Sequence, residues 1–256
     1  MKSDVLGDRM KAYERSAETQ LRPDLPICIR IDGRGFSKYT RGFLKPFDSR
    51  ISDAMRATTR ALVQETNARM GYTQSDEITL ILLSGPDQPP FFDGRVQKLC
   101  SVLASLAAVT FDRALKAARP PTFDARVWQV PDMETANEVL LWRALDARRN
   151  GVSSAYRAHF SAKRMKGKSA KEMLRDLRDA GVVFEEAYAQ KDRLGTYMRR
   201  VTRERQIPDE VWTKIPQRLR PESQVMRRSS VEEVEMPFWG HVKNGVDVIF
   251  KGATPS

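Results

Sequence analysis

The chain has 256 residues, of which 41% are apolar and 30% charged, as in a globular protein. No apolar tract is long enough to cross a bilayer, and the charged stretch at 1–20 lacks the apolar centre of a signal peptide. We therefore expect a cytoplasmic protein without a membrane partner. The net charge of +11 favours polyanionic partners, with nucleotides and nucleic acid first among them.

Cysteine and histidine are too few and too scattered for a zinc site or a Ser/His/Asp triad. Cys28 and Cys100 lie in apolar stretches without CxxC spacing, and His159 and His241 are far apart. A catalytic metal would need oxygen ligands, which favours Mg²⁺ or Mn²⁺.

The N-terminal half alternates between strand and helix patterns. Residues 26–32 alternate apolar and polar side chains and predict a strand that ends at Asp32 and Gly33. After a Gly-rich basic loop, Asp48 or Ser49 caps a predicted helix that stops at Gly71. A tight polar turn then leads into a second strand, ITLILL.

A loop rich in Gly and Pro at 84–90 precedes a long predicted helix, from about 93 to 119. A third strand follows at 123–130, and a further helix at 135–150. The order β, α, β-hairpin, α, β is the split βαβ pattern. We therefore predict an α+β fold in which residues 1–145 form a ferredoxin-like palm, an antiparallel sheet with helices on one face. Many polymerases and nucleotidyl cyclases use this topology.

Residues 146–256 predict a basic helical region with an irregular tail. Eleven Lys and Arg lie between 143 and 178, which is either a solvated helical face or a surface for a polyanion. A serine and a glycine delimit a short helix within 167–181. The last forty residues look irregular, with a hairpin turn at Asn244-Gly245.

Two acidic residues mark the same edge of the predicted sheet. Asp32 ends the first strand and Asp76 precedes the second, and the two strands are neighbours in a βαβ-hairpin arrangement. Each acid alone has a simpler explanation, as a turn residue or a solvent-facing side chain. Together they suit a phosphoryl-transfer site, where carboxylates hold Mg²⁺. The Gly33 carbonyl is available as a further oxygen ligand.

Cationic side chains that suit phosphate lie nearby in the predicted elements. Lys45 lies in the loop after the first strand, and Arg95 and Lys98 lie in the first turns of the long helix. The GRG at 33–35 is not a dinucleotide fingerprint, and no GxxxxGK[ST] loop is present.

With RIDGRGF, LKPFDSR, YTQSDE and FDARV in this order, the sequence resembles the tRNA(His) guanylyltransferase family. The resemblance covers about residues 1–200 and includes the bacterial and archaeal relatives, which are 3′-to-5′ nucleotide-adding polymerases. It implies a nucleotidyltransferase in which Asp32, the Gly33 carbonyl and Asp76 bind two Mg²⁺ ions, with Mn²⁺ as a substitute. Glu77 would be an accessory catalytic acid beside them.

The resemblance also implies sites for ATP and GTP as substrates and for tRNA or tRNA-like RNA. We expect nucleotide contacts from Gly33, Arg34, Gly35, Phe36, Lys45, Asp48, Ser75, Arg95 and Lys98. We expect RNA contacts from Arg30, Arg148, Arg149, Asn150, Lys163, Arg164 and Lys166.

In this family a nucleoside triphosphate activates the 5′-monophosphate of an RNA, and the 3′-hydroxyl of an incoming nucleotide then attacks it. Members are commonly tetramers, so we expect a homotetramer. Where the eukaryotic enzymes read HINNLYN, this chain reads RRNGVSS, with Arg148 in place of the histidine and Asn150 in agreement. This departure favours the relatives that repair 5′-truncated tRNAs over dedicated guanylate addition to tRNA(His).

Two other functions fit the same residues. The palm could make a small nucleotide product without RNA, or it could bind RNA or nucleotides without turnover. The acids Asp32, Asp76 and Glu77 argue against a pure binding protein, because clustered carboxylates need a cation to neutralise them.

Overall fold

The computed structural model describes residues 5–85 and 88–256, so residues 86 and 87 of the predicted loop lie outside it. In the described part, six strands form one antiparallel sheet in the order β4-β1-β3-β2-β5-β6. The strands are β1 (Ile27–Gly33), β2 (Met70–Gln74), β3 (Glu77–Leu82), β4 (Phe123–Gln129), β5 (Thr196–Gln206) and β6 (Val225–Val234).

The helices lie between and after these strands. They are α1 (Val5–Ser16), α2 (Phe36–Tyr39), α3 (Ser49–Thr66), α4 (Val96–Leu115), α5 (Met133–His159), α6 (Ala162–Met165), α7 (Ala170–Asp179), α8 (Phe184–Ala187), α9 (Gln190–Leu194), α10 (Asp209–Trp212) and α11 (Gly245–Phe250). The predicted order of strand, helix, hairpin, helix and strand is confirmed by β1, α3, β2-β3, α4 and β4. Among the described residues, no helix is both long and apolar enough to span a membrane.

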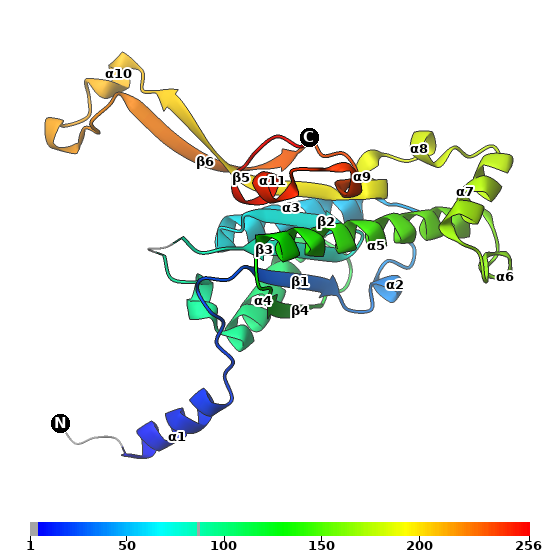
Figure 1. Cartoon of the computed structure of the whole chain (residues 1–256), viewed down its shortest axis with the longest axis horizontal. Coiled ribbons are helices and arrows are strands. Elements are labelled where there is room, and N and C mark those ends of the chain that lie inside the picture. Colours follow the sequence, from blue (N-terminus) through cyan, green and yellow to red (C-terminus); the bar gives the residue numbers. More distant parts are fainter. Residues whose placement is uncertain (1–4, 86–87) are drawn as a thin grey trace.

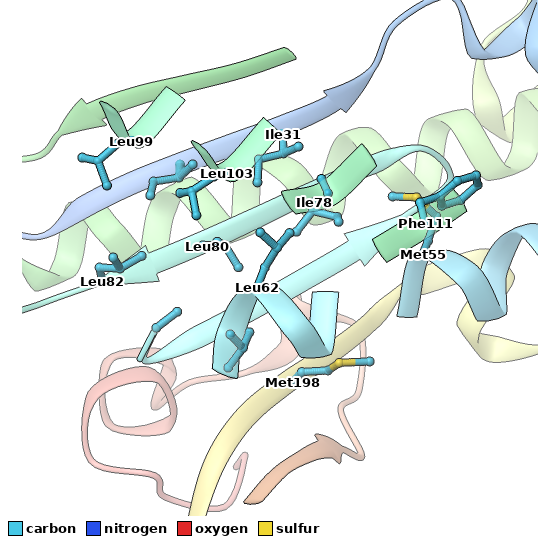
Figure 2. Packing of buried hydrophobic residues seen from close by; sticks show 14 of the residues in the cluster. Ile31, Met55, Leu62, Ile78, Leu80, Leu82, Leu99, Leu103, Phe111 and Met198 are labelled. Atoms are coloured by element: carbon cyan, nitrogen blue, oxygen red, sulfur yellow. The ribbon is translucent and has the colours of Figure 1, made fainter. Parts of the chain in front are cut away.

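One face of the sheet packs against α3 and α4. Alternate residues of β1 and β3, such as Ile31 and Leu80, point toward Leu62 of α3 and Leu103 of α4 (Figure 2). The alternation of apolar side chains along β1 produces this contact, because successive side chains of a strand point to opposite faces.

The other face of the sheet is also covered, by α5 and α11, and this corrects the prediction of helices on one face only. Cys28, Met70 and Ile81 point to this second face and pack with Leu140 of α5 and Val248 of α11. The reason is visible in ITLILL, whose apolar residues do not alternate with polar ones. A strand that is apolar on both faces needs a cover on both.

The C-terminal half contains more regular structure than its composition predicts. Strands β5 and β6 pair over ten residues and extend beyond the body of the protein as an arm that carries α10 (Figure 1). The expected irregular tail is therefore wrong for 225–234. The outer arm has no core face to produce an apolar alternation, and pairs such as Arg203 with Glu232 replace it.

Two local predictions are also corrected, and one is confirmed. Asn244-Gly245 does not form a hairpin turn; Asn244 precedes α11, and its side chain binds the backbone of Thr254 and Ser256. The expected boundary between 145 and 146 falls inside α5, which is continuous. Ser169 caps α7 as predicted, with Glu172 completing a capping box.

Helix α3 ends earlier than predicted, because Asn67 adopts a left-handed conformation after Thr66. Gly71 instead lies inside β2, where an added Cβ would be 2.4 Å from a methyl carbon of Val63 and 3.1 Å from that of Thr59. The glycine lets α3 approach the sheet closely.

We predict that Gly71→Ala lowers the free energy of unfolding by about 1–3 kcal/mol, because the new methyl group overpacks a buried contact. Urea unfolding measures this change. Gly85→Ala is a control, since the nearest described atom to its Cβ is 4.0 Å away. Equal stability of the two variants would contradict the close packing of α3 on β2.

Candidate active site

A two-residue turn brings Asp76 to the end of β1. Gln74 pairs with Glu77 across the turn, and Ser75 takes a left-handed conformation with a φ of 56°. The Gly33 amide donates a hydrogen bond to the Asp76 carbonyl at 3.0 Å, which joins the turn to β1. The prediction that Asp32 and Asp76 meet at one edge of the sheet is thus confirmed by backbone pairing.

The two carboxylates lie in an environment that disfavours their charge. Burial raises the pKa of Asp76, and the Asp32 carboxylate adds to the rise, while a hydrogen bond from Ser75 opposes it. Burial likewise raises the pKa of Asp32, with a further contribution from Asp124. Within 5–85 and 88–256, neither Asp32 nor Asp76 forms a salt bridge. A bound cation would relieve this repulsion.

Oxygen ligands are available for such a cation, and they suit Mg²⁺ or Mn²⁺. Asp32 and Asp76 supply carboxylates, and the Gly33 backbone lies between them. No group of three or more His, Cys, Asp or Glu side chains is arranged to hold a metal in the described residues. An ion here would therefore take its remaining ligands from water or from a phosphate, as Mg²⁺ commonly does.

Both carboxylates line a polar cavity of about 450 Å³, which we call the carboxylate cavity. It lies between the sheet edge and α5. Its walls are formed by Arg30, Asp32, Tyr72, Gln74, Ser75, Asp76, Glu77, Arg143, Asp146, Ala147, Asn150, Ser154 and Arg157.

A second, smaller cavity of about 130 Å³ adjoins the first and is more apolar. Lys45 lines it, together with the side chains of Phe47 and Met55. The two cavities share four polar wall residues, which are Gln74, Ser75, Asn150 and Ser154. The carboxylate cavity is thus the more polar of two adjoining cavities, and the smaller one adds apolar side chains beside cationic ones.

Glu77 does not face the carboxylate cavity as a free acid. Both of its carboxylate oxygens accept hydrogen bonds from Arg143 of α5, at 2.6 and 2.7 Å, and Arg30 lies 3.9 Å away. Arg143 also donates to Asp146 at 2.9 Å. Burial raises the pKa of Glu77, and the Arg143 guanidinium opposes that rise. This ion pair fastens α5 to the strand that follows Asp76.

Several predicted nucleotide contacts also have structural partners, so their role toward a nucleotide stays a prediction. Phe36 is buried in an aromatic cluster with Phe111 and Phe123. Asp48 caps α3 and binds Arg50, whose guanidinium lowers the pKa of the Asp48 carboxyl. Gly33 has no room for a Cβ, which would lie 2.3 Å from the Phe36 ring.

The other predicted nucleotide contacts divide into two groups. Lys45 and Ser75 line the cavities, whereas Arg34 and Gly35 are exposed on the loop after β1. Arg95 and Lys98 line neither cavity, since they lie at the N-terminal end of α4, on the opposite face of the sheet from α5. Their role toward a triphosphate stays a prediction.

The predicted RNA contacts spread over a wider surface. Arg30 and Asn150 line the carboxylate cavity, and Arg148 and Arg149 are exposed on α5. Around α6, Lys163 and Lys166 are exposed, and Arg164 packs over the Phe160 ring and lies 3.7 Å from Asp176.

Helix α5 contributes a polar wall of which the sequence analysis named only Asn150. Arg143, Asp146, Asn150, Ser154 and Arg157 all line the carboxylate cavity. Their spacings of three and four residues place them on one face of a helix, which is the signal that could have identified them.

Comparisons with known proteins identify the chain. Residues 7–131 match the family model described as tRNAHis guanylyltransferase. A bacterial tRNA(His) guanylyltransferase (Thg1)-like protein in complex with ATP is 30% identical, with a TM-score of 0.72, over 76% of this chain and 88% of that one. Another such protein, in complex with GTP, is 26% identical, with a TM-score of 0.69, over 90% of this chain and 91% of that one.

A curated relative, the tRNA(His) guanylyltransferase of Schizosaccharomyces pombe, is 33% identical over 152 residues, which are 56% of this chain and 56% of the relative. The chain therefore spans little more than half of that enzyme. The sheet, the paired carboxylates and these likenesses define a nucleotidyltransferase. The chain belongs to the tRNA(His) guanylyltransferase family.

We predict that Asp76→Asn stabilises the metal-free protein at neutral pH, because the variant lacks a charge that folding buries beside Asp32. The raised pKa sets the pH window. Below the ordinary value of 3.8 the wild-type carboxyl is protonated in both states and the difference vanishes, while above the raised value it is largest.

Thermal unfolding with and without MgCl₂ checks this expectation. Mg²⁺ should raise the melting temperature of the wild type, because binding at a hundredfold excess over Kd adds about 2.7 kcal/mol to the free energy of unfolding. The melting temperature of Asp76→Asn should stay nearly unchanged. Destabilisation by Asp76→Asn, or an equal response of both proteins to Mg²⁺, would contradict a cation site here.

We predict that Arg143→Ala lowers the free energy of unfolding by about 3–5 kcal/mol, because it leaves the Glu77 charge buried without its partner. The double variant Glu77→Leu/Arg143→Met should recover most of this loss. Arg149→Ala serves as the control, since that exposed arginine also binds Asp146 and such pairs contribute about 0–1 kcal/mol. Urea unfolding of the variants measures the differences, and a small loss from Arg143→Ala would contradict a fastening role.

Proposed function

We propose that this protein adds nucleotides in the 3′-to-5′ direction to the 5′ end of tRNA or a tRNA-like RNA. The observation that carries the proposal is the pair Asp32 and Asp76, two carboxylates that form no salt bridge within the described residues, in a polar cavity that adjoins a less polar one. The strand and helix order supports a ferredoxin-like palm as the catalytic unit. The ATP and GTP complexes of its relatives support triphosphate substrates.

In the proposed reaction, an oxygen of the RNA 5′-monophosphate attacks the α-phosphorus of ATP or GTP, and pyrophosphate leaves. The 3′-hydroxyl of an incoming nucleoside triphosphate then attacks the 5′-phosphate, and the activating nucleoside monophosphate leaves. Mg²⁺, when bound, neutralises charge on the leaving groups and orients the attacking hydroxyl.

Different residues along the two cavities would bind the metal ions and the triphosphate. Asp32 and Asp76, held rigidly by the joined strand ends, would bind the two ions. Lys45 and Ser75 would contact the triphosphate from the adjoining cavity, whose apolar wall would take the base. Glu77, through Arg143, would position Asp76. Arg95 and Lys98 would join the triphosphate site only from a neighbouring subunit of the proposed homotetramer.

The segment 148–154 bears on the choice of RNA. RRNGVSS keeps only one residue of the eukaryotic signature HINNLYN, with Arg148 where the signature has histidine. Because that side chain is changed, we propose repair of 5′-truncated tRNAs in the cytoplasm as the activity, and not guanylate addition dedicated to tRNA(His).

We predict that the purified protein, with Mg²⁺ and labelled triphosphates, extends a 5′-monophosphorylated tRNA that lacks its first nucleotide. Asp32→Asn and Asp76→Asn should each lower the rate at least about 100-fold, because metal stabilisation of a transition state amounts to several kcal/mol. Asp247→Asn is the matched control, since that acid lies on α11, away from both cavities. Products resolved on a gel measure the rates.

The same gel separates the alternatives. Extension of full-length tRNA(His) by one guanylate alone would assign the dedicated activity. Conversion of triphosphates to a small product, without RNA extension, would assign cyclase-like chemistry. Unchanged triphosphates and RNA would leave a binding function.

A further inference from the structure

Trp142 is exposed beside the carboxylate cavity. It lies on α5 and is 49% exposed, although it is the largest type of side chain. Its ring centroid is 4.5 Å from the Arg143 guanidinium and 6.0 Å from that of Arg30. Both arginines line the carboxylate cavity, and both lie beside Glu77. Trp142 thus packs against two anchored cations at the cavity wall and still exposes about half of its surface.

On its other side Trp142 borders a groove between α5 and α7, of about 1260 Å³, which we call the α5–α7 groove. Apolar and cationic side chains both line it. Its walls are Trp142, Leu145, Arg148, Arg149, Val152, Ala170, Lys171, Glu172, Leu174, Arg175 and Arg178. Five of these are cations and one is an acid, Glu172, whose carboxylate already binds Ser169 in the cap of α7.

The aromatic and cationic side chains of the α5–α7 groove favour RNA over a second copy of this chain as its ligand. An exposed aromatic ring with a cationic track is the combination that binds unpaired nucleotides, because bases stack on the ring and phosphates follow the cations. A second copy of this chain, with a net charge of +11, would bring like charge to a groove that is already positive. Charge complementarity therefore favours RNA.

The position of the Trp142 ring indicates which part of the RNA would bind there. Trp142 lies between the cavity of Asp32 and Asp76 and the α5–α7 groove, so a strand that reaches the carboxylates can continue over it. In a tRNA the 5′ end is paired beside an unpaired 3′ terminus, which is the nearest source of an unstacked base.

We propose that Trp142 stacks on an unpaired base of the RNA substrate next to its 5′ end, and that the cations of the α5–α7 groove bind the phosphates that follow. This inference rests on the proposed function and names the substrate feature that the site reads: a single-stranded 3′ extension beside the 5′-monophosphate. An exposed ring held by Arg143 and Arg30 costs little to order when a base binds, because its position is already set.

Two labelled RNA hairpins test the inference by fluorescence anisotropy. They share one stem and a 5′-monophosphate, and only one carries a four-nucleotide 3′ overhang. Trp142→Ala should weaken binding of the overhang hairpin roughly 5- to 100-fold and change binding of the blunt hairpin by less than about twofold. Trp142→Phe should retain most of the affinity, since a phenyl ring also stacks. We also expect the overhang hairpin to quench tryptophan fluorescence in the wild type, because a base stacks on Trp142. In Trp142→Phe this quenching should be lost.

The cations of the groove have their own readout. Arg175→Ala/Arg178→Ala should lower the slope of log affinity against log salt for the overhang hairpin by about one to two. Arg113→Ala is the matched control, because that exposed arginine lies on α4, which covers the opposite face of the sheet.

Each outcome decides the matter. Asp247→Asn, whose acid lies on α11 away from both cavities, should bind the overhang hairpin like the wild type. Equal binding of both hairpins by the wild type and Trp142→Ala would overturn the stacking role and leave the proposed function standing. A lower sedimentation mass of Trp142→Ala would make the groove an interface between copies and overturn the inference. If the wild type binds neither hairpin, the proposed function falls as well.

Discussion

The arrangement depends on one partly buried ion pair, between the buried Arg143 of α5 and the half-buried Glu77 of β3. Glu77 follows Asp76 directly, so the same contact that closes α5 over the sheet also determines where Asp76 can lie. Arg143 approaches from a helix that packs on the second face of the sheet, where the apolar side chains of Cys28 and Ile81 give way to Arg30 and Glu77 toward the turn that carries Asp76. The Arg143–Glu77 pair thus lies at the border between this apolar cluster and the polar carboxylate cavity.

Local sequence patterns predicted the strands and helices that form from neighbouring residues. The alternation in 26–32 and the apolar run in 78–83 identified two neighbouring strands, and their order along the chain placed Asp32 near Asp76. Arg143 was not predictable in the same way, because its partner is 66 residues away and an arginine among apolar residues of a helix reads as a surface residue. The arm formed by β5 and β6 was missed for the opposite reason: outside the core it buries neither face, so backbone hydrogen bonds and cross-strand ion pairs give it a regular form.

Local packing and ligand binding compete for the same residues around the first strand. Phe36 and Asp48 lie in segments that match the family, yet the ring fills the core and the carboxylate caps a helix. Asp32 and Asp76 line the carboxylate cavity without a salt bridge in the described part of the chain, and this leaves them available to a ligand. The sequence motifs thus predicted where the site lies, but a residue's presence in a motif does not by itself tell whether it packs the core, caps a helix or binds a ligand.

Gly33 illustrates how such overlap limits inference from sequence comparison. A side chain at this position would collide with the Phe36 ring at 2.3 Å, whatever happens at the adjacent carboxylates. The packing of the Phe36 ring therefore requires glycine here whether or not the protein is catalytically active. A decayed homologue of this family should therefore be recognised by replacement of Asp32 or Asp76, since neither is required by packing, while RIDGRGF could persist around them as a record of the fold.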